Sequence, residues 1–150
     1  MMMSQSLKQF SHVFSEIPFN RILGLTLDAI EKDHIVISFT MKKELIGNYM
    51  HGILHGGVIS SVLDMAGGAA AMVAAIYKHE SDDLEKVTAI LSKASTVSLN
   101  VDFLRPGKGE KFVAKAYISH SGNRITFTRM ELYNQESLLI ASGSAAYMIG

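Results

Sequence analysis

The 150-residue sequence contains no cysteine, which excludes disulfide bonds, thiolate nucleophiles and cysteine-based zinc sites. Neither sign of charge is in excess, because 14 lysines and arginines balance 14 aspartates and glutamates. The longest basic run is only Lys42 and Lys43. A nucleic-acid-binding role therefore has little electrostatic support, and we expect no nucleic acid among the partners.

The N-terminal stretch MMMSQSLKQFSHVF lacks the unbroken apolar run of a signal peptide, which predicts a cytoplasmic protein. No internal repeat or linker divides the chain. Its length suits one domain over residues 1–150, in which residues 1–20 form an N-terminal helix and lead-in.

Residues 58–77 form a long apolar run in which Asp64 is the only charged residue. The run is long enough to cross a membrane, but a charge at its centre would cost roughly 2.5–3.5 kcal/mol there. It is also rich in alanine, glycine and serine. A helix that is apolar on all sides can instead be buried inside a globular domain. We therefore predict a buried helix and no membrane partner.

The other segments predict one helix and several strands. Helical spacing predicts a helix over residues 4–16, ended by Pro18, with inward-facing Leu7, Phe10, Val13 and Phe14. Strands are predicted over residues 22–30, 34–41, 96–104, 112–120, 124–133 and 138–149. The polar connection over residues 79–95 has room for one helical turn. The pattern indicates an α+β fold, with an antiparallel sheet of five or six strands packed around one long helix.

The segment over residues 96–104 alternates strictly between apolar and polar side chains. One predicted face carries Val97, Leu99, Val101 and Phe103, and the other carries Thr96, Ser98, Asn100 and Asp102. Such alternation is typical of a half-buried strand.

The stretch NYMHGILHGGVISSVLDMAGGAA, residues 48–70, carries the candidate chemistry. Gly56 and Gly57 come just before the apolar helix, where backbone N–H groups lack helical partners and favour an anion or a developing oxyanion. The alternative is a simple glycine turn. The buried position expected for Asp64 requires partners or a shifted pKa. Small or polar residues near its side of the helix indicate a pocket: Gly57, Ser60, Ser61, Gly67 and Gly68.

The spacing of Gly57 and Asp64 restricts how they act together. Seven helical residues span roughly 10 Å, so one carbonyl group cannot contact both. If both act on the same acyl group, they come from different copies of the chain. The alternative is a structural Asp64 that bonds to Ser60 or to a loop.

Other catalytic and metal-binding motifs have little support. His51 and His55 have the spacing of a zinc pair but lack the accompanying glutamate, so we expect no metal. The chain also lacks the G-x-S-x-G elbow, the P-loop and the G-x-G-x-x-G fingerprint, and no cofactor is expected.

The segments GNYMHGILHGGVISSVLD, VSLNVDFLRPG and SGNRITF together resemble the hotdog-fold acyl-CoA thioesterases of the phenylacetate-degradation (PaaI) type, over roughly residues 20–149. The resemblance implies a curved sheet around a long helix, and a homodimer or homotetramer with its sites at the subunit interface. It implies hydrolysis of acyl-CoA thioesters by carboxylate-assisted attack of water.

The resemblance also implies roles for single residues. Asp64 would be the general base or nucleophile, and the Gly56 N–H, with Gly57 beside it, would polarise the thioester carbonyl. His55 would orient the loop or touch the thioester, and Thr96 would help to hold the attacking water. The expected substrate-contacting residues are Tyr49, Ser60, Ser61, Arg105, Gly122, Asn123 and Arg124, the last four of them near the CoA tail.

One position departs from the family pattern. The family's asparagine stands six residues before the histidine, where this chain has Tyr49, and Asn48 is one residue further away. A one-residue bulge would restore Asn48 to the site; otherwise Tyr49 faces it.

Two other functions compete with hydrolysis. One is a non-catalytic acyl-CoA binding or sensing module, since a fold does not fix a function. Sensors of this fold usually carry a DNA-binding segment, and residues 1–20 are too short and too weakly charged for one. The other is a 3-hydroxyacyl dehydratase, which would need a His–acid pair in a different motif. Tyr49, Met50, Met65 and Met72 either line a flexible acyl pocket or belong to the core.

Overall fold

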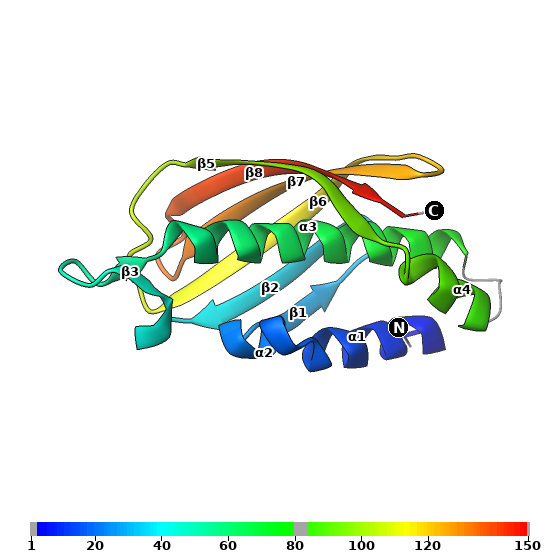
Figure 1. Cartoon of the computed structure of the whole chain (residues 1–150), viewed down its shortest axis with the longest axis horizontal. Helices are drawn as coiled ribbons and strands as arrows, with labels where there is room; N and C mark the ends of the chain where they lie inside the picture. The colour runs from blue at the N-terminus through cyan, green and yellow to red at the C-terminus, as the bar shows by residue number, and fades with distance from the viewer. Residues whose placement is uncertain (1–2, 80–83, 150) are drawn as a thin grey trace.

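A six-stranded antiparallel sheet curls around one long helix, α3, in the computed structural model, which describes residues 3–79 and 84–149 (Figure 1). The helices are α1 (Gln5–Glu16), α2 (Pro18–Leu23), α3 (Gly56–Lys78) and α4 (Leu84–Leu91), with a 3-10 turn at Lys43–Leu45. The strands are β1 (Thr26–Ile30), β2 (His34–Thr40), β3 (Ile46–Asn48), β4 (Ile53–Leu54), β5 (Ser95–Phe103), β6 (Lys111–Ser121), β7 (Ile125–Asn134) and β8 (Leu139–Met148).

The strand order in the large sheet is β1-β2-β6-β7-β8-β5, and every neighbouring pair is antiparallel. The predicted α+β fold, with five or six strands around one helix, is therefore confirmed. The strands β3 and β4 form a separate small hairpin that projects beyond the N-terminal end of α3 (Figure 1). The edges of the large sheet are β1, against which α1 packs, and β5.

The helix α3 is the core of the domain, as predicted. By length and composition it could cross a membrane, but most of it is buried inside the curl of the sheet. Its buried residues include Val62, Leu63, Ala66, Ala69, Ala70, Val73 and Ile76. The small side chains among them let the strands approach the helix closely.

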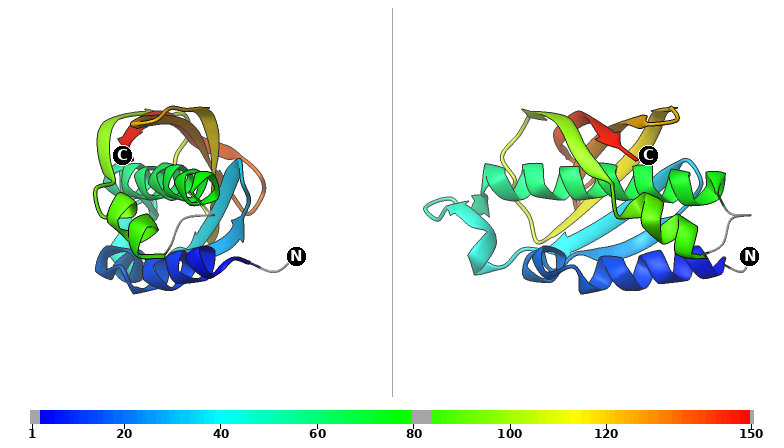
Figure 2. Two further views of the ribbon diagram at one scale, coloured as in Figure 1. Left: turned by 90° about the vertical axis from the view of Figure 1, so that its right-hand side faces the viewer. Right: turned by 45° about the vertical axis from the view of Figure 1, so that its right-hand side comes forward.

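The helices α1 and α4 cover the side of α3 that the sheet leaves open (Figure 2). Ser4 caps α1 by accepting a hydrogen bond from the Leu7 N–H at 3.2 Å. Leu7, Phe10 and Phe14 are buried as predicted, but Val13 is 48% exposed, so its predicted inward position is wrong. Val13 lies instead at the mouth of a hollow between α1 and α4.

The segment around residue 22 is helical, which corrects the predicted start of the first strand. Pro18 opens α2, because proline suits the first helical turn, where its missing N–H has no helical partner. Gly24 ends the helix with a left-handed φ of 72°, and the strand begins only at Thr26. The polar connection also holds more helix than the single turn predicted, since α4 has eight residues.

The strand β5 is exposed on both faces of the single chain, although its alternation predicted a half-buried strand. Val97, Leu99 and Phe103 are 55%, 36% and 56% exposed. The cause is the position of β5 at the edge of the sheet, where β8 is its one neighbouring strand among the described residues.

Candidate active site

The backbone N–H groups at the N-terminus of α3 differ in their hydrogen bonding. His55 is the N-cap residue, and its Nδ1 accepts a hydrogen bond from the Gly57 N–H at 2.7 Å. Its carbonyl oxygen accepts from Val58 and Ile59. Because Nδ1 accepts, the proton of the neutral imidazole is on Nε2. Within residues 3–79 and 84–149, the Gly56 N–H has no acceptor, which leaves it available to a ligand.

The hairpin before α3 fixes the position of His55. The His55 N–H donates to the Leu45 carbonyl oxygen at 2.9 Å, and the Leu54 N–H donates to that of Gly107. Gly47 lies directly against His55, since a Cβ on Gly47 would lie 2.5 Å from the His55 Cα. Gly47 is therefore a positioning residue that the sequence reasoning did not identify; a glycine inside a short strand was the only signal for it.

Two hydroxyl groups hold the Asp64 carboxylate. Oδ1 of Asp64 accepts a hydrogen bond from the Thr96 hydroxyl at 3.0 Å and one from the Tyr147 hydroxyl at 3.1 Å. Oδ2 has no hydrogen-bond partner in the part of the chain that the structure describes. Asp64 is half-buried and lines a pocket, so one carboxylate oxygen is fixed and the other is open to a ligand.

Tyr147 is the main site residue that the sequence did not reveal. It is 3% exposed, and its hydroxyl also lies 2.9 Å from the backbone carbonyl oxygen of Asp64. Burial raises the pKa of this hydroxyl far above its usual range, and the charge of Asp64 raises it further. Tyr147 therefore keeps its hydroxyl proton, which the carboxylate and the backbone carbonyl oxygen of Asp64 share. Gly67 makes room for it, because a Cβ there would lie 2.5 Å from the tyrosine oxygen.

A β-bulge brings Thr96 to the same carboxylate. The register between β5 and β8 shifts between Thr96 and Ser98, so Thr96 pairs with the inward-facing Tyr147. Strict alternation placed Thr96 on the face opposite Leu99, Val101 and Phe103, and that assignment is wrong. The extra residue of the bulge, Val97, turns the Thr96 hydroxyl towards α3.

The pocket at Asp64 has a volume of about 140 Å³. Its lining comes from α3, from the segment that leads into β5 and from β8: Asp64, Met65, Gly68, Met72, Ala94, Ser95, Thr96, Tyr147 and Ile149. Apart from Asp64 and the hydroxyl groups that line it, its walls are apolar or small. It suits a small polar group with an apolar extension.

Ser60 and Ser61 bond back to their own helix. The Ser60 hydroxyl donates to the carbonyl oxygens of Gly56 and Gly57, at 3.1 and 3.3 Å, and the Ser61 hydroxyl donates to that of Gly57 at 2.7 Å. Neither hydroxyl bonds to Asp64, whose partners are Thr96 and Tyr147 instead.

The hairpin carries Asn48 and Tyr49 away from Asp64 of the same chain. A register shift lies between Ile46 and Asn48, at Gly47. Asn48 is exposed, and Tyr49 and Met50 are 87% and 81% exposed. His51 follows in the turn and Gly52 has a φ of 62°, so His51 and His55 do not share a helix. Among residues 3–79 and 84–149, no three histidine or acidic side chains are grouped as metal ligands.

The residues expected near a CoA tail lie at opposite ends of α3. Arg105 follows β5 near the N-terminal end of the helix and donates to the Leu139 carbonyl oxygen at 2.8 Å. The turn of Gly122, Asn123 and Arg124 lies at the other end, where Lys78 donates to the Gly122 carbonyl oxygen at 3.3 Å. The 23 residues of α3 span roughly 35 Å, so one chain does not bring these groups together.

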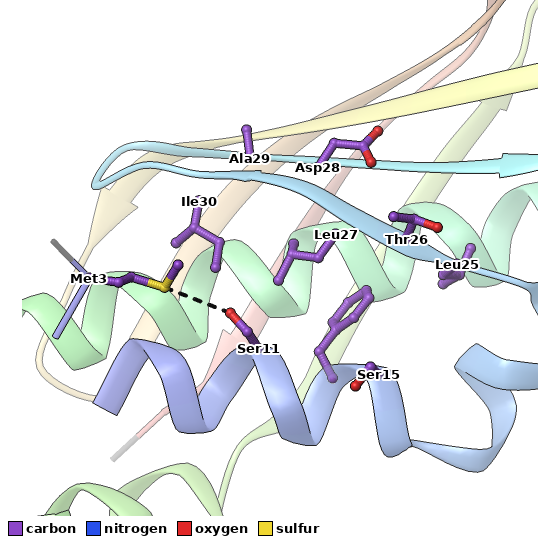
Figure 3. Close-up of a pocket in the computed structure, with 10 residues that line it drawn as sticks. Met3, Ser11, Ser15, Leu25, Thr26, Leu27, Asp28, Ala29 and Ile30 are labelled. Atoms are coloured by element: carbon purple, nitrogen blue, oxygen red, sulfur yellow. Dashed lines mark hydrogen bonds between the residues drawn. The ribbon is translucent and has the colours of Figure 1, made fainter. Parts of the chain in front are cut away.

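A larger hollow of about 440 Å³ lies between α1 and β1 (Figure 3). The hydroxyls of Ser11 and Ser15 donate to carbonyl oxygens of α1, and Ser11 also lies 3.9 Å from the Met3 sulfur. Asp28 is the only ionisable side chain among the described residues of its lining. The hollow does not include Asp64 or Gly56, so we place the candidate chemistry at Asp64.

The Asp64 carboxylate and the Gly56 N–H are the groups of this site that can take part in a reaction. A carboxylate with one free oxygen can take a proton from water, and a free N–H at a helix N-terminus can stabilise an oxyanion. Gly56 and Asp64 are eight helical residues apart, roughly 12 Å, so they cannot act on one carbonyl group within one chain.

Comparison with known proteins shows the family of the chain. The model of the Thioesterase superfamily matches residues 51–141, which include the N-terminal cap of α3, Asp64 and Thr96. The chain belongs to the thioesterase superfamily. The matched region ends before Tyr147, which lies in the last strand.

Relatives of similar length support the same assignment. The chain is 40% identical over 147 residues to the medium/long-chain acyl-CoA thioesterase YigI of Escherichia coli strain K12, covering 97% of this chain and 95% of that one. A crystal structure of a Shewanella oneidensis protein related to the thioesterase superfamily superposes with a TM-score of 0.93 at 37% identity, covering 97% and 96% of the two chains.

The fold also matches that of the phenylacetate-degradation type. The Escherichia coli PaaI structure superposes with a TM-score of 0.78 over 99% of this chain and 96% of its own, at 19% identity. The hotdog fold of this thioesterase-superfamily member is thus confirmed.

Proposed function

We propose that this protein hydrolyses acyl-CoA thioesters to a free carboxylic acid and CoA. The observation that carries the proposal is the Asp64 carboxylate, which lines a pocket. Thr96 and Tyr147 fix its Oδ1, and its Oδ2 has no hydrogen-bond partner among the described residues. The name of the 40% identical relative supports a medium or long acyl chain as the substrate class.

In the proposed reaction, Asp64 assists the attack of water on the thioester carbonyl. The carboxylate takes a proton as the water oxygen bonds to the carbonyl carbon, and the Gly56 N–H stabilises the negative charge on the carbonyl oxygen. The carbon–sulfur bond then breaks, and the CoA sulfur leaves as a thiolate that takes up a proton. Thr96 and Tyr147 keep the carboxylate in position throughout.

We further propose that each site is built from two chains. The free edge of β5 carries exposed Val97, Leu99 and Phe103 beside unpaired backbone groups, a combination that favours pairing with another strand. A two-fold pairing of β5 with its copy would place two α3 helices side by side in opposite directions. The Gly56 N–H of one chain would then face Asp64 of the other.

The same arrangement accounts for the two groups expected near the CoA tail. With antiparallel α3 helices, Arg105 of one chain comes near residues 122–124 of the other, although they lie at opposite ends of a single chain. The projecting hairpin would carry Asn48 and Tyr49 towards the second chain.

The test is hydrolysis of a series of acyl-CoA thioesters by the wild type, Asp64→Asn and Asp28→Asn. Asp28 is exposed on β1, so Asp28→Asn makes the same chemical change away from the pocket. We expect turnover by the wild type and by Asp28→Asn, and none by a folded Asp64→Asn chain. A non-catalytic binding module would bind acyl-CoA without hydrolysis by any of the three, and hydrolysis by Asp64→Asn would refute the role of Asp64.

A further inference from the structure

An apolar cavity of about 230 Å³ lies beside the Asp64 pocket, between α1, α3 and α4. Its apolar lining is Phe10, Val13, Phe14, Ile17, Met72, Leu84, Val87 and Leu91. No ionisable side chain lines it among the described residues. The rest of the lining is polar and uncharged: Ser6, Gln9, Thr88 and Ser92. The hydroxyls of Thr88 and Ser92 donate to carbonyl oxygens within their own segment, at 2.9 and 2.7 Å. The cavity is therefore suited to a hydrocarbon chain.

The cavity and the Asp64 pocket meet at one side chain. Met72 lines both hollows and is half-buried. Asp64, Gly68 and Met72 follow one another at four-residue spacing on α3, so they share a face of the helix and span roughly 12 Å. Gly68 lines the Asp64 pocket between the other two residues, with the Tyr147 ring beside it. The flexible thioether of Met72 can move aside.

The segment after α4 joins the two hollows on the other side. Leu91 and Ser92 line the apolar cavity, and Ala94 and Ser95 line the Asp64 pocket. A chain that starts at Asp64 and follows α3 past Met72 therefore enters the space between α1 and α4. At its far end Val13 and Leu84 are 48% and 37% exposed, which leaves the mouth of the cavity lined by apolar side chains.

We propose that this cavity binds the distal part of a medium or long fatty acyl chain, whose thioester lies at Asp64 and which passes Met72. The inference rests on the proposed thioesterase function for the thioester end, and on the apolar lining for the chain itself. Acyl groups too short to pass Met72 do not reach the cavity, so the cavity does not raise their kcat/KM. Longer groups gain about fourfold in kcat/KM for each methylene that leaves water.

The kinetic test compares butanoyl-CoA with dodecanoyl-CoA in the wild type and in Met72→Trp. A tryptophan fills the passage, so we expect the ratio of kcat/KM for dodecanoyl-CoA to that for butanoyl-CoA to fall at least tenfold. Val13→Lys, at an exposed position, is a second variant that does not depend on overpacking the core, and it should lower the same ratio. His12→Lys adds the same charge next to it on α1, outside the cavity lining, and should leave the ratio unchanged. An unchanged ratio in folded Met72→Trp and Val13→Lys overturns the proposal and leaves the thioesterase function standing.

A binding test works whether or not the protein is a thioesterase. The chain has no tryptophan, so Val13→Trp provides a single fluorescent probe at the mouth of the cavity, and His12→Trp is its matched control. Titration with dodecanoate should shift the emission of Val13→Trp to shorter wavelength and leave that of His12→Trp unchanged. If the wild type hydrolyses no acyl-CoA but Val13→Trp responds, the proposed function fails and the fatty-acyl cavity stands. If Val13→Trp does not respond, the cavity proposal is wrong.

Discussion

The hydroxyl oxygen of Tyr147 lies 3.1 Å from Oδ1 of Asp64 and 2.9 Å from the backbone carbonyl oxygen of the same residue. One buried hydroxyl thus contacts both the side chain and the main chain of Asp64, across 83 positions of sequence. The relationship ties the last strand of the sheet to the middle of the core helix.

Tyr147→Phe should lower kcat about tenfold and change KM little. The hydroxyl contacts the carboxylate and not the substrate, so its loss affects the reacting group more than ground-state binding. Steady-state kinetics with an acyl-CoA of medium length measure both constants. Tyr133→Phe is the control, because Tyr133 lies on the outer face of the sheet beneath Lys115. An equal fall in kcat in both variants would contradict a positioning role for Tyr147.

The stability of the protein should decrease above about pH 10, and Tyr147 should account for part of that loss. Burial raises the pKa of Tyr147 in the folded state, so the unfolded chain loses the proton first as the pH rises. The contribution is therefore complete below the unfolded pKa of about 10 and is lost above it, at up to about 1.4 kcal/mol per pH unit. Urea unfolding between pH 8 and about 11.5 should show a shallower loss for Tyr147→Phe. Parallel curves for the two proteins would contradict this.

Gly67→Ala should destabilise the protein by about 1–3 kcal/mol and lower kcat. The new Cβ would lie 2.5 Å from the Tyr147 oxygen and 2.8 Å from the Thr128 hydroxyl oxygen, so both must move. Gly68→Ala is a matched control for stability alone, because Gly68 itself lines the Asp64 pocket. Its Cβ would lie 3.4 Å from the Tyr147 ring, an ordinary contact. Alanine is favoured over glycine in a helix, so the control should be neutral or more stable by up to about 1 kcal/mol. Equal losses of stability at both positions would show that the space around Tyr147 is not limiting.

His55→Ala should lower the free energy of unfolding by about 1 kcal/mol, because the helix loses the acceptor for the Gly57 N–H. His55→Asn should restore most of that stability, since asparagine is a favoured N-cap residue. Activity then separates the two roles considered for His55. If it only orients the cap, His55→Asn stays active; if it touches the thioester, the variant is stable and slow.

Local sequence patterns predict most of the helices and strands. The spacing of Leu7, Phe10 and Phe14 predicted α1, and the apolar run around Asp64 predicted α3. The first strand was predicted to start too early because Ile22 and Leu23 are apolar, whereas Pro18 and Gly24 mark the start and end of a short helix. Proline at the start and glycine just after the end are the sequence signal for this helix.

The sequence predicts less of the candidate site than of the fold. Gly56, Gly57 and Asp64 stand out because they interrupt an apolar segment. Alternation along β8 is compatible with an inward-facing Tyr147, but its contact with Asp64 depends on the curl of the whole sheet. The bulge at Val97 turns Thr96 towards α3, and the strictly alternating sequence does not predict it.

Complementation between two inactive chains tests the shared site most directly. Asp64→Asn removes the carboxylate, and Gly56→Pro removes the backbone N–H. Proline is compatible with this first helical position, and the preceding His55 has the extended conformation (φ −62°, ψ 137°) that a residue before proline prefers.

Each variant alone should be folded, dimeric and inactive. After mixing and exchange of subunits, half of the dimers contain one chain of each kind, and each of these has one site with both groups intact. We expect recovery of about a quarter of the wild-type rate of acyl-CoA hydrolysis. Mixed dimers that form, as shown by mass spectrometry, and that remain inactive would contradict a site shared between Asp64 of one chain and Gly56 of the other.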